Sequence, residues 1–276
     1  MAAVYPLEWL VRQVAPGAEV VALATGGAEA HGLELSPGQR RALESADVVA
    51  YLGDIDFQPQ VEEAAALSAG QVVNAADVLG EDQLRHAAAH DHDDGEEDAD
   101  AVDPHFWFDP TLVAQVAGAV GEAFAAADPA GADAYREAAD RVAAELATLA
   151  AELDELLGDC AHAEAIVSHE AYAYLLEPRG LDQHGIAGTT PEAGGSPAEL
   201  ARLTDEIRAE GIPAVLAEPI EGRGDAEALA AETGVELLEI DPLESAPADQ
   251  PDPGYPERLR QQAAMFARAL DCAGGR

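Results

Sequence analysis

The sequence predicts an α/β protein with two lobes, and three observations carry this prediction. Short β-rich runs alternate with helix signals in both halves of the 276-residue chain. Residues 133–157, between the halves, contain neither Gly nor Pro. Hydrophobic residues make up 48% of the chain and charged residues 25%, which is enough to build two cores. We therefore expect lobes over residues 1–131 and 160–276, joined by a rigid helix over 132–159.

The β-rich runs and the capping signals predict where each element begins. Ser36 with Pro37 and Gln39 is typical of a helix start, and Ser196 with Pro197 and Glu199 repeats that pattern. This β/α alternation is typical of parallel, Rossmann-like sheets. The expected strands cover residues 19–24, 47–52, 71–74, 165–167, 213–216 and 235–240.

The segment between the lobes carries the strongest helix pattern. Its apolar positions alternate in steps of four and three residues: Val142, Leu146, Leu149, Leu153 and Leu156. A helix over this segment would be about 37 Å long. A core helix or a coiled-coil partner would show the same pattern, and we favour a strut between the lobes.

Charge and composition exclude several classes of protein. The net charge of −40 would repel nucleic-acid phosphates and disfavours an anionic membrane surface. We find no apolar run of about 18 residues and no basic region at the start of the chain, so we expect either a cytosolic protein or one whose leader has been removed. Cys160 and Cys272 lack zinc-site spacing and are either two buried thiols or one disulfide.

Three histidines lie where α/β proteins place functional groups. His31 occupies a Gly-rich turn before the helix that starts near Ser36, and His105 lies between two Asp-Pro pairs. His169 follows the strand at 165–167, at the sheet edge where ligands bind. Imidazoles that come from separate loops suit a zinc site, whereas manganese prefers more oxygen ligands. The expected fourth ligand is Asp241, at the end of the last strand, with Glu218 as its rival.

Residues 86–100 form a polar segment that cannot build a core. Three histidines and seven carboxylates fall within these fifteen residues. We expect an acidic, His-rich loop that binds cations loosely, although a merely solvated acidic loop would have the same composition.

Six short motifs follow one another along almost the whole chain. They are Tyr5-Pro6-Leu7, Ala28 to His31 with Ser36-Pro37, Asp103 to Pro110, Ser168 to Leu175, Thr190 to Pro197, and Asp241-Pro242-Leu243. Together they resemble the cluster A-I solute-binding proteins of zinc and manganese ABC transporters. Tyr5-Pro6-Leu7 looks like the family's opening strand, and Asp103 to Pro110 is similar to its most specific motif.

The resemblance implies a monomer that binds Zn(II) in a cleft between its lobes and delivers it to a membrane ABC permease. It also implies residence outside the cytoplasm, in the periplasm or at the cell surface. His169 favours the zinc branch, because the manganese branch commonly has Glu at that position. The neighbouring Glu170 leaves a Mn(II) site as the alternative. His31, His105, His169 and Asp241 would bind the metal.

Two other functions share parts of this pattern. Three histidines with an open position also describe a catalytic zinc site, but we find no HExxH-like helix to supply a general base. A metal-buffering surface protein would instead depend on the acidic loop. A fourth protein ligand would close the site to water, so we expect a binding protein and not an enzyme.

Overall fold

The computed structural model describes the chain except residues 27–29, 87–100, 189–193, 220–221, 248–250 and 276. Most of the acidic His-rich loop and residues 190–193 therefore lie outside the described residues. The described chain forms two compact units, and the division between them falls within one long helix, after Ala150. The first unit contains residues 1–84, 109–150 and 243–258, and the second contains residues 85–108, 151–242 and 259–276.

The first unit is built on a small parallel sheet. Strands β1 (Val48–Tyr51) and β2 (Gln71–Asn74) pair in parallel, and Ala2 bridges to both Ala22 and Ala50. The strand expected over 19–24 is thus reduced to a single bridge at Ala22; Val21 beside it is 41% exposed. The helices of this unit are α1 (Tyr5–Val14), α2 (Pro37–Glu44), α3 (Pro59–Ala65), α4 (Ala75–Leu79), η1 (Glu81–Gln83) and α5 (Pro110–Ala127).

The expectation that Tyr5-Pro6-Leu7 forms a strand is wrong, because these residues begin helix α1. Pro6 lies in the first helical turn, where its missing N–H leaves no bond unmade. The backbone N–H of Tyr5 donates to the carbonyl of Glu244 at 2.8 Å. The start of this helix is thereby tied to a segment that is distant in sequence.

Helix starts follow the predicted caps. The side chain of Ser36 accepts from the backbone N–H of Gln39, which closes a capping box at α2. Ser196 accepts from the backbone N–H of Glu199 at the start of α8 (Pro197–Glu210), and Asp109 accepts from that of Thr111 at α5. By length and composition α5 could cross a membrane, but half of it is buried in the first unit, as in an ordinary core helix.

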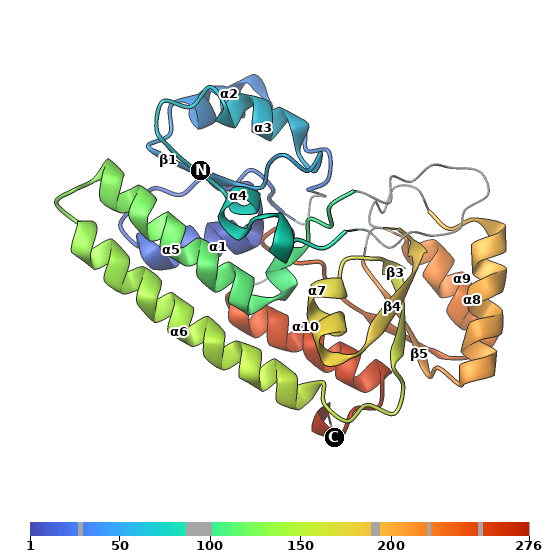
Figure 1. The fold of residues 1–276 in the computed structure, drawn as a ribbon. Helices are drawn as coiled ribbons and strands as arrows, with labels where there is room; N and C mark the ends of the chain where they lie inside the picture. The colour runs from blue at the N-terminus through green and yellow to red at the C-terminus, as the bar shows by residue number, and fades with distance from the viewer. Residues whose placement is uncertain (27–29, 87–100, 189–193, 220–221, 248–250, 276) are drawn as a thin grey trace. The chain divides into compact units, whose positions relative to one another are not determined.

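The long helix α6 (Ala132–Leu156) agrees closely with the predicted one and is uninterrupted (Figure 1). Its apolar residues Val142, Leu146, Leu149 and Leu153 are buried. Within the first unit it pairs with α5: the guanidinium of Arg136 on α6 forms an ion pair with Glu122 at 2.7 Å.

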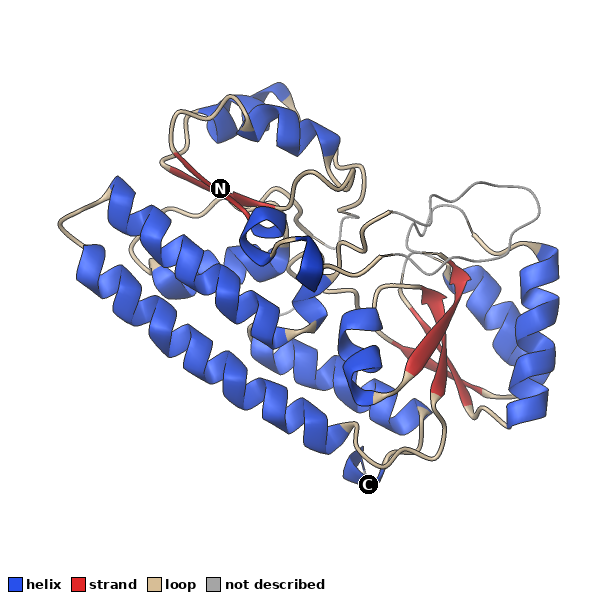
Figure 2. Ribbon diagram, in the orientation of Figure 1, coloured by secondary structure: helices blue, strands red, loops and turns tan. Residues whose placement is uncertain are grey.

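The second unit contains a four-stranded parallel sheet, in the order β4-β3-β5-β6, with helices packed against it (Figure 2). The predicted α/β class with parallel sheets is confirmed. Helices α8 and α9 cover one face through a core that includes Ile166, Leu203 and Leu229. The remaining elements are β3 (Glu164–His169), β4 (Asp182–Ala187), β5 (Ala214–Ala217), β6 (Glu236–Glu239), η2 (Phe106–Phe108), α7 (Ala173–Leu176), η3 (Glu177–Arg179), α9 (Arg223–Thr233), α10 (Tyr255–Ala269) and η5 (Ala273–Gly275).

The two cysteines form a disulfide. Cys160 follows α6, and Cys272 follows α10, 112 residues later in the chain. Of the two alternatives that the sequence leaves open, the structure therefore selects the bridge.

Candidate metal centre

Two buried histidines meet in the second unit. His169 is the last residue of β3, and His105 lies directly before the short helix η2. Their side chains are 1% and 0% exposed, and their Nε2 atoms lie 3.4 Å apart. The end of a parallel strand and a stiff Pro-containing loop thus bring two imidazole nitrogens together.

A carboxylate lies against the other ring nitrogen of each histidine. Asp103 Oδ1 is 2.7 Å from Nδ1 of His105, and Glu218 Oε1 is 2.6 Å from Nδ1 of His169. A carboxylate at Nδ1 favours the tautomer with its proton there, which leaves the Nε2 lone pair for a metal. The hydroxyl of Tyr172 also donates to Glu218 Oε1 at 2.8 Å and helps to fix that carboxylate.

The loop that carries Asp103 is held at several points. Asp103 Oδ1 also accepts from the backbone N–H of His105 at 2.9 Å, which closes a tight turn around Pro104. The hydroxyl of Tyr174 donates to the Asp103 carbonyl at 3.0 Å and accepts from the backbone N–H of Arg85 at 2.8 Å. The imidazole of His105 is thus oriented by a carboxylate whose own position is fixed.

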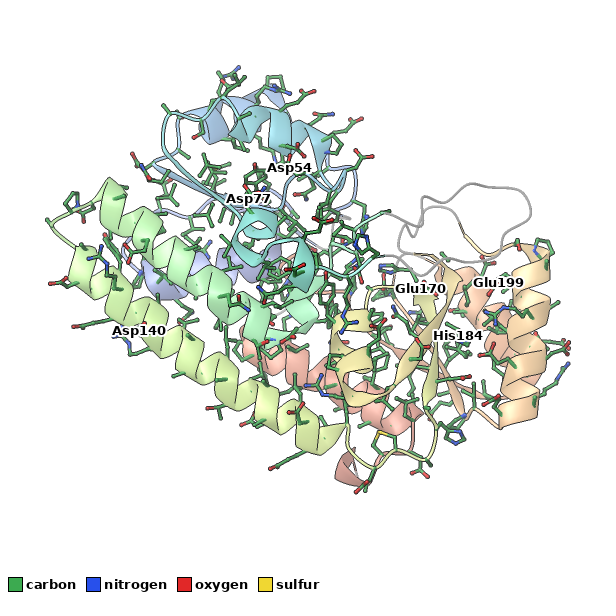
Figure 3. The ribbon with its side chains drawn as sticks, in the orientation of Figure 1. Asp54, Asp77, Asp140, Glu170, His184 and Glu199 are labelled. Carbon is green, nitrogen blue, oxygen red and sulfur yellow. A yellow bond between two sulfur atoms is a disulfide. The ribbon has the colours of Figure 1, made fainter. Side chains whose placement is uncertain are left out.

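We expect Asp103→Asn to lower zinc affinity about 10- to 100-fold, because the neutral amide holds the His105 tautomer less firmly. Isothermal titration of metal-stripped protein measures the change. Asp140→Asn, at an exposed carboxylate on α6 (Figure 3), is the control and should leave the affinity unchanged. Equal affinities for the Asp103 variant and the wild type would show that this carboxylate does not orient a metal ligand.

A second pair of candidate ligands, one imidazole and one carboxylate, lies in the first unit. His31 Nε2 is 3.4 Å from Oε1 of Glu244, and these side chains are 10% and 3% exposed. The ring of Phe57 packs edge-on against His31, with centroids 4.7 Å apart. The other oxygen of Glu244 accepts from the backbone N–H of Ala30 at 3.0 Å, directly before His31. Glu244 and the His31 loop therefore brace each other.

The backbone turns sharply before Glu244. Leu243 has φ of 61°, in the left-handed region that a bulky residue rarely adopts. The segment after it is held by Arg258, which donates to the Ser245 carbonyl at 3.0 Å and lies over the Tyr5 ring. Burial raises the pKa of Tyr5 far above its ordinary value, so its hydroxyl stays protonated and donates to Asp252 at 2.7 Å.

The spacing within each pair suits tetrahedral zinc. Bonds of about 2.0–2.1 Å at the tetrahedral angle separate two ligand atoms by roughly 3.3 Å. Both the His105–His169 pair and the His31–Glu244 pair measure 3.4 Å between ligand atoms. Each unit thus holds two groups at the spacing of one tetrahedral edge.

The other residues that the sequence offered as ligands make the following contacts. Asp241 donates its backbone N–H to the side chain of Gln262 at 2.8 Å, and the carboxylate beside His31 is instead Glu244. Glu218 lies behind His169, at Nδ1. Glu170 (Figure 3) is buried and accepts from the backbone N–H of Gly185 at 2.9 Å, which links β3 to β4. The sequence signal for Glu244 was its place directly after the Asp241-Pro242-Leu243 motif.

Parallel sheets, with buried imidazoles at a strand end and in a loop, define the class of the protein: an α/β protein with candidate metal ligands in both units. A family model described as ZnuA, zinc-uptake complex component A, periplasmic, matches residues 1–269. The chain belongs to this ZnuA family.

Relatives of known function support the membership. The chain is 26% identical over 279 residues to the high-affinity zinc uptake system protein ZnuA of Bacillus subtilis, an alignment that covers 96% of this chain and 85% of that protein. It is 25% identical over 271 residues to the zinc-binding protein AdcA of Streptococcus pyogenes serotype M1, which covers 93% of this chain. The chain spans about half the length of AdcA, 52%.

Solved structures share the fold. A crystal structure of ZnuA superposes with a TM-score of 0.81 at 27% identity and covers 98% of this chain and 97% of that one. The laminin-binding protein Lmb of Streptococcus agalactiae, described as an adhesin with metal-transporting activity, superposes with a TM-score of 0.84 at 24% identity over 98% of both chains. The likeness to Lmb shows the fold alone.

Proposed function

We propose that this chain is the extracytoplasmic solute-binding component of an ABC importer, which captures Zn(II) and delivers it to a membrane permease. The observation that carries the proposal is the His105–His169 pair. Both Nε2 atoms are buried at the spacing of zinc ligands, and a carboxylate lies at each Nδ1. Membership in a family of periplasmic zinc-uptake components supports the same function.

We propose further that His31 and Glu244 complete the site with His105 and His169, so that both units contribute to one ion. Three imidazoles and one carboxylate form a compact set that suits zinc better than manganese. Glu244 replaces Asp241 in this proposal, because Glu244 Oε1 lies 3.4 Å from Nε2 of His31. With four protein ligands, no open position would remain for a reacting water, which favours capture over catalysis.

A competition titration of metal-stripped protein tests this function. We expect one tightly bound zinc per chain that about a hundredfold excess of manganese does not displace, because nitrogen-rich sites bind zinc far more strongly. Glu244→Gln should lower zinc affinity about tenfold or more, since a charged ligand becomes a neutral one. Asp241→Asn is the matched control, and it should leave the affinity within about threefold of the wild type.

Two outcomes would contradict the proposal at different points. Loss of affinity in the Asp241 variant and not in the Glu244 variant would return the fourth ligand to Asp241. Manganese that competes at concentrations similar to those of zinc would show that the transported metal is manganese.

The transport step is tested in cells. Deletion of the gene should slow growth in zinc-depleted medium, and added zinc should restore growth.

A further inference from the structure

A second group of metal-binding side chains lies in the second unit, away from the histidine pair. Glu164, His184 and Glu206 each offer one ligand atom, and these atoms lie within 4.8 Å of one another. Glu164 is the first residue of β3, whereas His169 is the last. At the rise of an extended strand the two ends are about 16 Å apart, so this group is separate from the proposed zinc ligands.

Three different elements bring this group together. In the β3–β4 register, Glu164 lies opposite Asp182 and Ile166 opposite His184, so Glu164 and His184 share one face of the sheet. Helix α8 packs on that face through Leu203 and Ile207. Figure 3 shows His184 on the side of the sheet toward α8. The packing therefore holds Glu206, on α8, against the imidazole of His184.

The charges around the group favour a cation. His184 Nδ1 is in direct contact with Glu206 Oε1. Burial raises the pKa of Glu164, the charge of His184 opposes that rise, and the nearby carboxylates of Glu210, Glu206 and Asp182 add to it. Arg202 is the nearby counter-charge, but it binds the other oxygen of Glu206 at 2.6 Å and leaves Oε1 toward His184.

The three side chains are also accessible to an ion. The side chain of His184 is 27% exposed and that of Glu206 is 13% exposed. Glu164 is half-buried beside them. An incoming ion needs only to part the His184–Glu206 contact, because all three ligand atoms are already close together.

We propose that Glu164, His184 and Glu206 form a second divalent-cation site, which takes zinc or a similar first-row ion more weakly than the main site. One imidazole and two carboxylates are ligands that zinc accepts, and three protein ligands leave room for water in the remaining position. A bound ion would pin α8 to the β3–β4 edge of the sheet. This inference does not depend on the transport function.

Nuclear magnetic resonance of the full chain with isotope-labelled histidine tests the site with zinc alone as the probe. We expect the His184 ring signals to move after the first equivalent of zinc is bound, while those of His162 stay in place. Glu164→Gln and Glu206→Gln should each weaken this second binding step about tenfold or more. Asp205→Asn, which removes the exposed carboxylate next to Glu206 on α8, should leave it unchanged.

Two results would overturn the proposal. One is a His184 ring that does not respond to zinc up to about 1 mM, because a site that fails to fill at that concentration binds with less than about 4 kcal/mol of free energy. The other is an undiminished response in both glutamate variants, because zinc would then bind the imidazole alone. Thermal unfolding of each variant without metal shows whether the sheet and α8 remain folded.

Discussion

We expect His105→Ala to abolish tight zinc binding and to lower the affinity more than a hundredfold. His105 is fully buried, its Nε2 lies 3.4 Å from that of His169, and Asp103 holds its other nitrogen. Loss of an outer carboxylate alone weakens metal sites about 10- to 100-fold, and loss of the ligand itself should cost more. Competition with a fluorescent zinc chelator covers this range of affinities.

The control for this variant is His162→Ala, which removes a partly exposed histidine of the same unit. Its zinc affinity should match that of the wild type. Because His105 is buried, its removal also leaves a cavity, so the unfolding of metal-free His105→Ala and His105→Gln should be measured alongside. A folded His105 variant with wild-type affinity would rule out the proposed centre, whatever the acidic loop binds.

The positions of His105 and His169 follow from local rules that can be applied to the sequence. His169 ends an apolar strand, and a parallel sheet presents functional groups at that edge. His105 lies between two Asp-Pro pairs that stiffen its loop, and the structure adds that Asp103 is the partner of its ring. These placements depend on strand ends and prolines, both of which are visible in the residues themselves.

The position of Glu244 could not be predicted in the same way. Strand β6 ends at Glu239, which makes Asp241 the natural candidate at the strand end. The chain continues instead through a turn in which Leu243 has a left-handed conformation. Leucine rarely adopts this conformation, so the sequence does not predict the turn. Tyr5, more than 230 residues earlier in the sequence, binds the Glu244 carbonyl. Tertiary contacts therefore decide which carboxylate lies beside His31.

The same division holds for the fold. Helix α6 and the caps at Ser36 and Asp109 were predictable, because apolar spacing and capping chemistry are local. Strand β4 was missed, since its sequence, Asp-Gln-His-Gly-Ile-Ala, is polar and contains Gly. Its backbone pairing with β3 makes this segment a strand, although its residues alone do not predict one.

The second large effect concerns the disulfide. We expect replacement of both Cys160 and Cys272 by Ala to destabilise the second unit by about 2–5 kcal/mol. The bridge closes a loop of 112 residues that contains all four strands of the sheet, so without it the unfolded chain gains conformational freedom. Urea unfolding measures the loss of free energy.

The two tryptophans allow this measurement to follow each unit separately. Trp107 is fully buried in the second unit, and Trp9 belongs to the first. In a Trp9→Phe background, Trp107 fluorescence should show that the unfolding transition moves to a lower urea concentration when both cysteines are replaced. A reducing agent should produce the same shift in the protein that keeps Cys160 and Cys272. In a Trp107→Phe background, the Trp9 transition should move less, because the loop that the bridge closes contains only residues 243–258 of the first unit. A shift below about 1 kcal/mol at Trp107 would mean that the reduced chain keeps enough residual structure in its unfolded state to cancel the effect of the bridge.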